Sequence, residues 1–366
     1  MKDFQLRNET KLLFCNDPSE DLAVLTAGKR TLFVYGGGSA KMNGCYDEVK
    51  RAVESAGGIF CEIGNASREL SEIEKGIRLA KGQGIQIVIG AGGASIMDCA
   101  KLIAFGVCHE ADLWDYVKGK KNPYGLAKLP LVLMPTYPSS GSEYGLSAVS
   151  VDSRTGDFGT AYGIPADTAI LVPKYSMSLS AEMTAYTGLV TLVQLSASTI
   201  GDKNPVSYDI GISVIRNVLS AVKKLKENPA DTDARGVILY GASISTSGRL
   251  GLGKEENYPY DIYELEFIPE ALYKAAYRKS LTTLFPRFLQ CMAKRHEEDI
   301  SQYFRDAFDF TGDIAESAGK MTRLFESFGV DMYFDGQVSV EDIQGIDVDT
   351  MLSVDEMVDI VKNCLR

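Results

Sequence analysis

Residues 85–101, IQIVIGAGGASIMDCAK, decide the fold of this chain. Residues 85–89 form the short, almost wholly apolar run that is typical of a buried strand, and glycines follow it directly. Residues 95–105 then have the pattern of a helix that Ser95 opens. A strand that leads through glycines into a helix predicts a βαβ unit, and the first amides of such a helix can bind a pyrophosphate.

The alternation of strand and helix patterns extends over the first half of the chain. Residues 31–35 and 59–63 are further short apolar runs next to glycines, and helical spacing follows each of them. In the second half long helical patterns dominate, and one of them places a set of apolar side chains on a single face: Ile212, Ile215, Leu219, Val222 and Leu225. We therefore predict an α/β dinucleotide-binding domain at residues 1–174 and a helical domain at residues 175–366, with a ligand cleft between them.

Length and charge narrow the class of protein. The chain has 366 residues and a formal net charge of −11, so two domains are expected, and nucleic acid or an anionic membrane is a disfavoured partner. No apolar run reaches membrane-spanning length, and residues 1–7 lack the core of a secretory signal, so we expect a cytoplasmic protein. The seven cysteines lack metal-type spacing and are expected to be reduced thiols. The expected partner is a small molecule, and a homodimer is one possible assembly.

Three blocks of the sequence carry a resemblance to a known family. They are YGGGSAKMNG at residues 35–44, GGASIMDCAK at residues 92–101 and PTYPSSGSE at residues 135–143. Over nearly its whole length the chain resembles the iron-containing (group III) alcohol dehydrogenases, in their butanol-dehydrogenase-like branch. The resemblance implies the architecture shared with dehydroquinate synthase, an α/β nucleotide-binding domain followed by an all-α domain, and a small carbonyl or alcohol substrate. The cofactor-binding positions that it implies are Gly36, Gly37, Gly38, Ser39, Lys41, Gly92, Gly93, Ala94, Ser95, Asp98, Thr136, Ser140 and Ser142.

Glycines at these positions let the backbone approach a ribose or phosphate without a Cβ clash. For residues 36–38 alone, an ordinary tight turn is an equally good interpretation. Ala94 stands where the family has glycine; it costs roughly 1 kcal/mol if its φ is positive, and otherwise it only narrows the groove. Asp98 corresponds to a residue near the nicotinamide in the family, and the alternative is a capping residue that forms a surface pair with Lys101.

The type of cofactor depends on the first glycine block. NAD-dependent members of the family often carry an Asp at its third position, which is Gly38 in this chain. The hydroxyl of Ser39 and the ammonium of Lys41 beside it suit a ribose 2′-phosphate, so NADP(H) is favoured over NAD(H).

The metal ligands of the family correspond to Val190, Gln194, Tyr263 and Tyr277, and its pocket histidine corresponds to Phe267. The chain contains only two histidines, His109 and His296, which excludes a histidine-rich zinc or iron site. A set of carboxylates stays open as an alternative that would suit magnesium or calcium: Asp261, Glu264 and Glu266. We expect no metal at this site.

Carbonyl reduction without a metal requires another electrophile. Tyr263 and Tyr277 can donate a hydrogen bond to a carbonyl oxygen, and Lys274 and Arg278 can lower a tyrosine pKa or bind an acidic substrate. The alternative is that both tyrosines only fill the space of the metal and its histidines. The sequence thus predicts a metal-independent NADP(H)-linked oxidoreductase that reduces an aldehyde or ketone, with Tyr277, Tyr263 and Lys274 as catalytic residues. Two alternatives are a nucleotide-binding pseudoenzyme that has lost metal-dependent activity and a non-redox enzyme that uses the same cleft.

Overall fold

A computed structural model describes residues 1–201 and 203–366. The chain forms two compact units. The α/β unit consists of Arg7–Leu179 and Ala242–Ser247. The helical unit consists of Met1–Leu6, Ser180–Gly241 and Gly248–Arg366.

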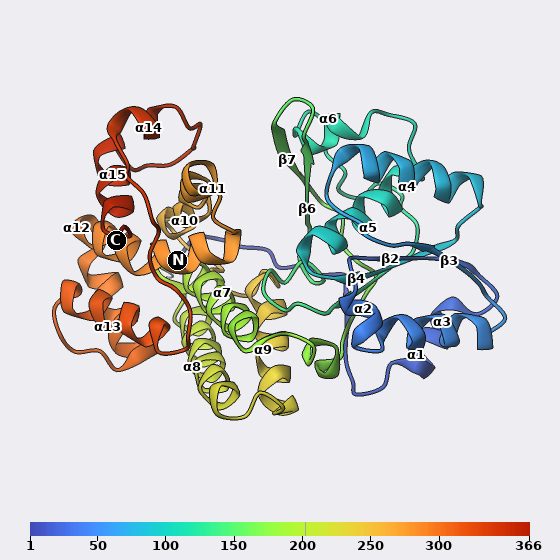
Figure 1. Ribbon diagram of the computed structural model, residues 1–366, viewed down its shortest axis with the longest axis horizontal. Helices are drawn as coiled ribbons and strands as arrows, with labels where there is room; N and C mark the ends of the chain where they lie inside the picture. The colour runs from blue at the N-terminus through green and yellow to red at the C-terminus, as the bar shows by residue number, and fades with distance from the viewer. Residues whose placement is uncertain (202) are drawn as a thin grey trace. The chain divides into compact units, whose positions relative to one another are not determined.

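The α/β unit is built on a six-stranded sheet of parallel strands in the order β1-β8-β5-β4-β2-β3 (Figure 1). In sequence order, these strands are β1 (Lys11–Phe14), β2 (Arg30–Tyr35), β3 (Ile59–Ile63), β4 (Ile87–Gly92), β5 (Leu131–Pro135) and β8 (Thr168–Leu171). A separate antiparallel hairpin joins β6 (Ser147–Asp152) to β7 (Asp157–Tyr162). The predicted class, a parallel α/β fold followed by a helical part, is confirmed.

Helices cover both faces of the sheet, which explains why its central strands are apolar on both sides. α1 (Ser19–Thr26) and α3 (Cys45–Ser55) lie on one face, and α4 (Leu70–Gly82) and α5 (Ala94–Gly106) lie on the other (Figure 1). Alternate residues of β2 therefore enter two different cores: Phe33 packs on the α3 side and Leu32 on the α5 side. Two short helices, α2 (Ser39–Met42) and α6 (Leu113–Val117), complete the unit.

The strand predicted at residues 85–89 lies further along the chain, at Ile87–Gly92. Ile85 belongs to the turn after α4, where its amide donates a hydrogen bond to the Ala80 carbonyl oxygen (3.0 Å). The strand continues through Gly90 because α5 packs very close to it: a Cβ at Gly90 would lie 2.6 Å from the Cβ of Ala100. Glycines that usually mark the end of a strand are here part of it.

The helical unit is formed around α7 (Ala181–Thr199), α8 (Pro205–Glu227) and the long α12 (Tyr277–Phe308). α7 is buried along almost all of its length, and the side chain of Ser180 caps its first turn by accepting from the Met183 amide (3.2 Å). The apolar face predicted on α8 is confirmed, since all five of its residues are buried. The remaining helices are α9 (Thr232–Ser245), α10 (Ile262–Leu265), α11 (Phe267–Tyr273), α13 (Ile314–Glu326), α14 (Val340–Gln344) and α15 (Val354–Lys362). Among the described residues, no helix combines the length and apolar character of a membrane span.

Candidate functional site

The three glycine-containing blocks meet at one edge of the sheet, beyond the carboxyl ends of β2, β4 and β5. Tyr35 pairs with Ala91, and Gly92 pairs with Pro135, so the three strands end at the same level. The Thr136 amide donates to the Gly92 carbonyl oxygen (3.0 Å), which holds the third block against the second. In parallel α/β sheets ligands bind at this edge.

The glycines of the first two blocks fall into two groups. A Cβ at Gly92 would lie 2.6 Å from Cγ1 of Ile96, and one at Gly36 would lie 3.3 Å from Cδ1 of the same side chain, so packing of α5 accounts for these two. A Cβ at Gly37 would meet nothing within 4 Å, one at Gly38 only the tip of Met42, and one at Gly93 only ordinary contacts with Tyr137. None of these last three glycines has the positive φ that would require glycine. The fold itself therefore does not demand glycine at positions 37, 38 and 93.

The second block begins α5. Gly93 is the residue before the helix and offers no side-chain cap, and Ala94 is the first helical residue. The amides of Ala94 and Ser95 have no partner within the helix, because the first amides of any α-helix lack one. Ala94 lies outside the left-handed region, so it carries no backbone strain.

Asp98 and Lys101 lie in the interior of the α/β unit, so the alternative of a surface pair is wrong. The Asp98 carboxylate accepts from Ser142 Oγ (2.7 Å) and from the Val149 amide (3.2 Å). The Lys101 ammonium, which is fully buried, donates to the carbonyl oxygens of Gly145 (3.0 Å) and Ser147 (2.7 Å). Burial lowers the pKa of Lys101 to about 8 and raises the pKa of Asp98. These bonds fasten the segment that follows the third block to α5.

The segment Ala242–Ser247 also holds the loop of the third block in place. The sequence patterns did not indicate this segment as part of the site. Gly141 has a φ of +64°, and a Cβ there would lie 2.2 Å from the Ala242 carbonyl oxygen. Thr246 Oγ1 donates to the Gly141 carbonyl oxygen (2.7 Å), and Ser243 Oγ donates to the buried carboxylate of Glu143 (2.6 Å). Partners about a hundred residues apart leave no local pattern, so sequence reasoning had no signal by which to find them.

Two of the four residues at which the resemblance implies the family's metal ligands lie within hydrogen-bonding distance of each other in the helical unit. Gln194 on α7 donates from Nε2 to the hydroxyl oxygen of Tyr277, the first residue of α12, over 3.5 Å. Val190 lies one turn before Gln194 and is fully buried, whereas Tyr277 is 37% exposed. Burial raises the pKa of Tyr263 on α10 well above its usual range, and the neighbouring Tyr277 and Tyr260 hydroxyls add to this effect.

The expected cations are not arranged to acidify these tyrosines. Lys274 ends α11 in a left-handed conformation, is exposed, and donates to the Ala271 carbonyl oxygen (3.3 Å). The guanidinium of Arg278 lies 5.7 Å from the ring centre of Tyr186. The pKa of Tyr263 is raised, which is the opposite of what a neighbouring cation would do.

These side chains do not fit a zinc or iron ion. Val190 has no donor atom, Gln194 offers only a neutral amide, and Tyr263 stays protonated because its pKa is raised. Within residues 1–201 and 203–366, no group of three or more His, Cys, Asp or Glu side chains is placed to hold a metal ion. The carboxylates of Asp261 and Glu264 accept instead from the segment at residues 349–351.

The two histidines lie elsewhere. The ring of His109 stacks 4.2 Å from that of Phe105 in the α/β unit, and the ring of His296 stacks 3.7 Å from that of Tyr258 in the helical unit. Each therefore has an aromatic packing partner of its own.

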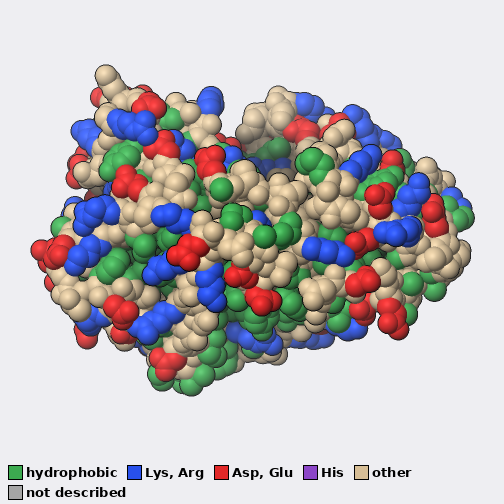
Figure 2. Space-filling model, turned by 60° about the horizontal axis from the view of Figure 1, so that its bottom comes forward, with side chains coloured by type: hydrophobic (Ala, Val, Ile, Leu, Met, Phe, Trp, Pro, Cys, Tyr) green, Lys and Arg blue, Asp and Glu red, His purple; other side chains and the backbone are tan. Residues whose placement is uncertain are grey.

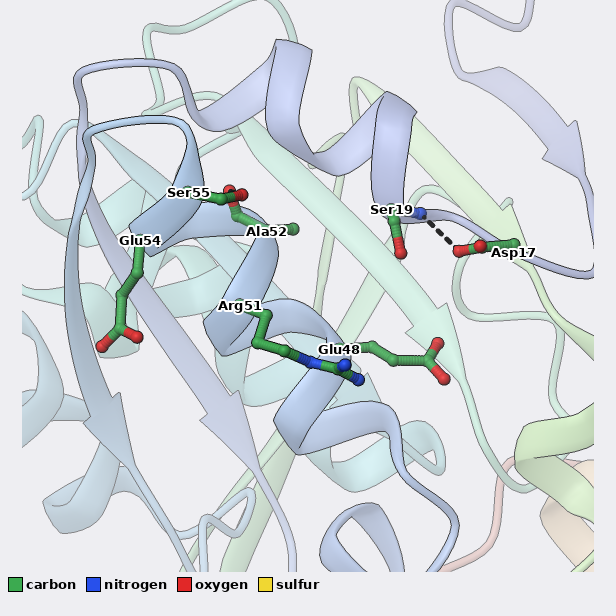
Figure 3. A pocket seen from close by; sticks show the side chains of 7 residues that line it. All are labelled: Asp17, Ser19, Glu48, Arg51, Ala52, Glu54 and Ser55. Atoms are coloured by element: carbon green, nitrogen blue, oxygen red, sulfur yellow. Dashed lines mark hydrogen bonds between the residues drawn. The ribbon is translucent and has the colours of Figure 1, made fainter.

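A surface hollow of about 600 Å³ lies between α1 and α3 (Figure 3). Its side chains include Asp17, Glu48 and Arg51. Glu48 already accepts from Lys174 Nζ (2.8 Å) and from the Tyr175 hydroxyl (2.6 Å), so its charge is balanced within the α/β unit. On the face shown in Figure 2, acidic and basic side chains are interspersed, without the broad basic surface that nucleic acid requires.

Comparisons with known proteins found one family model and several relatives to which the chain is similar. Residues 10–173 match the profile of the family described as iron-containing alcohol dehydrogenase. The chain is 28% identical to the probable NADH-dependent butanol dehydrogenase 1 of Bacillus subtilis, over 90% of this chain and 85% of that protein. It is 25% identical to the NADPH-dependent aldehyde reductase YqhD of Escherichia coli, over 90% of this chain and 88% of that protein.

The fold is similar to that of solved structures along the whole chain. The NADH-dependent butanol dehydrogenase A of Thermotoga maritima matches with a TM-score of 0.88 and 23% identity, over 100% of this chain and 99% of that one. The substrate- and cofactor-free form of YqhD matches with a TM-score of 0.88 and 19% identity, over 99% of this chain and 100% of that one. In residues 10–173 the chain is thus similar to the iron-containing alcohol dehydrogenases, and along its whole length it has the fold of the two solved structures.

Proposed function

We propose that this protein is an NADP(H)-linked oxidoreductase that reduces an aldehyde or ketone to the alcohol without a transition metal. The observation that carries the proposal is the set of glycines at 37, 38 and 93, which follow strands at the edge of the sheet where parallel α/β folds bind ligands and which neither packing nor backbone conformation requires. Relatives named as butanol dehydrogenases and as an aldehyde reductase support the reaction class.

In this proposal the glycine blocks bind the cofactor. The amides of Ala94 and Ser95 at the start of α5 bind the diphosphate, with Gly93 leaving room for its close approach. Residues 36–41 bind the adenosine ribose and its phosphate. Thr136 and Ser140 belong to the third block. The hydrogen bond from Ser142 to Asp98 maintains the shape of this block. A bound, reduced nicotinamide supplies the hydride.

Tyr277 and Tyr263 take the place of the metal as hydrogen-bond donors to the substrate oxygen. The hydroxyl of Tyr277, which accepts from Gln194, gives its proton to the substrate oxygen as the hydride arrives, and the 37% exposure of Tyr277 allows the resulting phenolate to regain a proton from water. Tyr263 remains a neutral donor at physiological pH because its pKa is raised. A preorganised donor stabilises the negative charge that develops on a carbonyl oxygen.

The proposal is tested by metal analysis and turnover of the same preparation. The protein, purified without a histidine tag, is dialysed against a chelator, and its zinc and iron are measured. It is then assayed with NADPH and with NADH against a series of straight-chain aldehydes and ketones. We expect turnover that is unaffected by the chelator, with well under one metal ion per chain.

Two results would contradict the proposal in different ways. Activity that the chelator abolishes and that added zinc or iron restores would show that a metal is used. Tight cofactor binding without turnover of any carbonyl compound would favour the nucleotide-binding pseudoenzyme.

A further inference from the structure

A lysine is fixed beside the first glycine block by two aromatic rings. The ammonium group of Lys41 lies 5.3 Å from the ring centre of Tyr35 and 4.8 Å from that of Tyr46. The two rings contact each other edge to face, with their centres 5.3 Å apart. The backbone amide of Lys41 donates to the Gly38 carbonyl oxygen (3.1 Å), so the residue belongs to the glycine turn itself. A cation over two aromatic faces has a restricted position although its side chain is exposed.

A carboxylate on the neighbouring strand lies near the second ring. Glu62 is a residue of β3 and pairs with Phe33 of β2, so it lies next to the strand that leads into the glycine turn. The Glu62 carboxylate, together with burial, raises the pKa of Tyr46 to about 12, so the Tyr46 hydroxyl stays neutral. Lys41, Tyr46 and Glu62 all belong to the α/β unit.

This arrangement bears on the choice between two cofactors. In dinucleotide folds that select NAD, a carboxylate about 20 residues after the glycines accepts a hydrogen bond from the ribose 2′-hydroxyl. Here the glycine turn itself carries a lysine whose ammonium group lies over the ring of Tyr46. A fixed ammonium group favours a phosphate over a hydroxyl, and it loses little conformational freedom on binding.

We infer that Tyr46 is a specificity-determining residue whose ring positions the ammonium group of Lys41 to bind the 2′-phosphate of NADP(H). The inference rests on the proposed cofactor function, and it adds one residue that does not contact the cofactor. Lys41 is the binding group, and Tyr46 is a positioning residue.

The test uses adenosine 2′,5′-bisphosphate and adenosine 5′-monophosphate, which differ only in the 2′-phosphate, so that hydride transfer is not required. Isothermal titration of the full-length protein should show the bisphosphate binding at least about tenfold more tightly. Lys41→Met should remove most of this ratio, and Tyr46→Leu should reduce it about three- to tenfold, because the ammonium loses its fixed position. Tyr46→Phe, which keeps the ring, should restore most of it. Binding of the monophosphate should change less than about twofold in all three variants.

Lys50→Met is the matched control. Lys50 lies on the same helix as Tyr46, and its ammonium is 5.8 Å from the ring centre of Phe60, so this variant removes an equal charge over an aromatic ring. It should leave the ratio within about twofold of the wild type.

Three results are distinguishable. A ratio in Tyr46→Leu equal to that of the wild type, while Lys41→Met lowers it, would overturn the role of Tyr46 and leave the cofactor proposal intact. Tighter binding of the monophosphate to the wild type would overturn the inference about the 2′-phosphate. Failure of both nucleotides and of NADPH and NADH to bind would overturn the proposed function itself. Lys41 is exposed, so its variant keeps the test valid even if Tyr46→Leu does not fold.

Discussion

Gly37→Ala should separate the needs of the fold from the needs of the ligand. The added methyl group would meet no atom within 4 Å, and the backbone of Gly37 is not left-handed. Such a replacement restricts the unfolded chain, and it typically raises the free energy of unfolding by about 0.4–1 kcal/mol. The variant should therefore be at least as stable as the wild type.

The same methyl group should weaken cofactor binding. If a ribose or phosphate packs against Gly37, an extra methyl in that contact costs about 1–3 kcal/mol, as overpacking does in a protein interior. This corresponds to a dissociation constant for NADPH about 5- to 150-fold higher. The increase in NADPH fluorescence on binding gives the dissociation constant, and urea unfolding gives the stability.

Gly82→Ala provides a matched control for this experiment. Gly82 ends α4, is exposed, and a Cβ there would also meet nothing within 4 Å. This variant should gain similar stability without any change in NADPH binding. Gly92→Ala would not be informative, because its Cβ would clash with Ile96 and destabilise the protein. An unchanged dissociation constant in Gly37→Ala would refute the reasoning and leave residues 36–38 as an ordinary turn.

Three further predictions concern catalysis, cofactor choice and pH. Tyr277→Phe should lower turnover about 10²- to 10³-fold with NADPH affinity intact. The control is Tyr273→Phe, which should keep wild-type turnover; the hydroxyl of Tyr273 donates to the Gln337 carbonyl oxygen (2.9 Å). Equal activity of both variants in steady-state assays would show that Tyr277 only fills space in the core. Gly38→Asp should shift the ratio of NADH to NADPH affinity towards NADH by at least about tenfold, because its carboxylate repels a 2′-phosphate; an unchanged ratio in titrations would exclude position 38 from the ribose site. Lys101 has a folded-state pKa of about 8, below its ordinary value of 10.5, so the unfolded chain binds the extra proton between these limits and stability rises with pH there. Relative to Lys101→Met, the wild type should gain on the order of 1–2 kcal/mol between about pH 7.5 and 9.5 in urea unfolding, and parallel pH profiles would contradict the lowered pKa.

The fold was predictable because the alternation of apolar runs, glycines and amphipathic stretches is local. The errors arose where packing between elements distant in the sequence determined the local structure. β4 extends through Gly90 because α5 approaches it closely, and no local rule distinguishes such a glycine from one that ends a strand. Asp98 and Lys101 have the spacing of a surface pair but are buried, because the segment after the third block supplies their hydrogen bonds.

The position of the glycine blocks was also predictable. They were recognisable from their spacing after strands, and the structure brings them to one edge of the sheet. The sequence left open which glycines serve the fold, and only the position of Ile96 separates Gly92 from Gly37. The position of Lys41 over the rings of Tyr35 and Tyr46 could not be predicted, because no linear pattern encodes contacts between side chains of different elements.

The α/β unit is not a continuous piece of polypeptide. Its last segment, Ala242–Ser247, consists of the end of α9 and the two residues after it, long after the strands have ended. A fragment that stopped at Leu179 would retain every strand of the sheet, yet it would lack Thr246 beside Gly141 and leave the buried carboxylate of Glu143 without the hydroxyl of Ser243. A gene fusion that borrows the α/β unit should therefore also carry this distant hexapeptide.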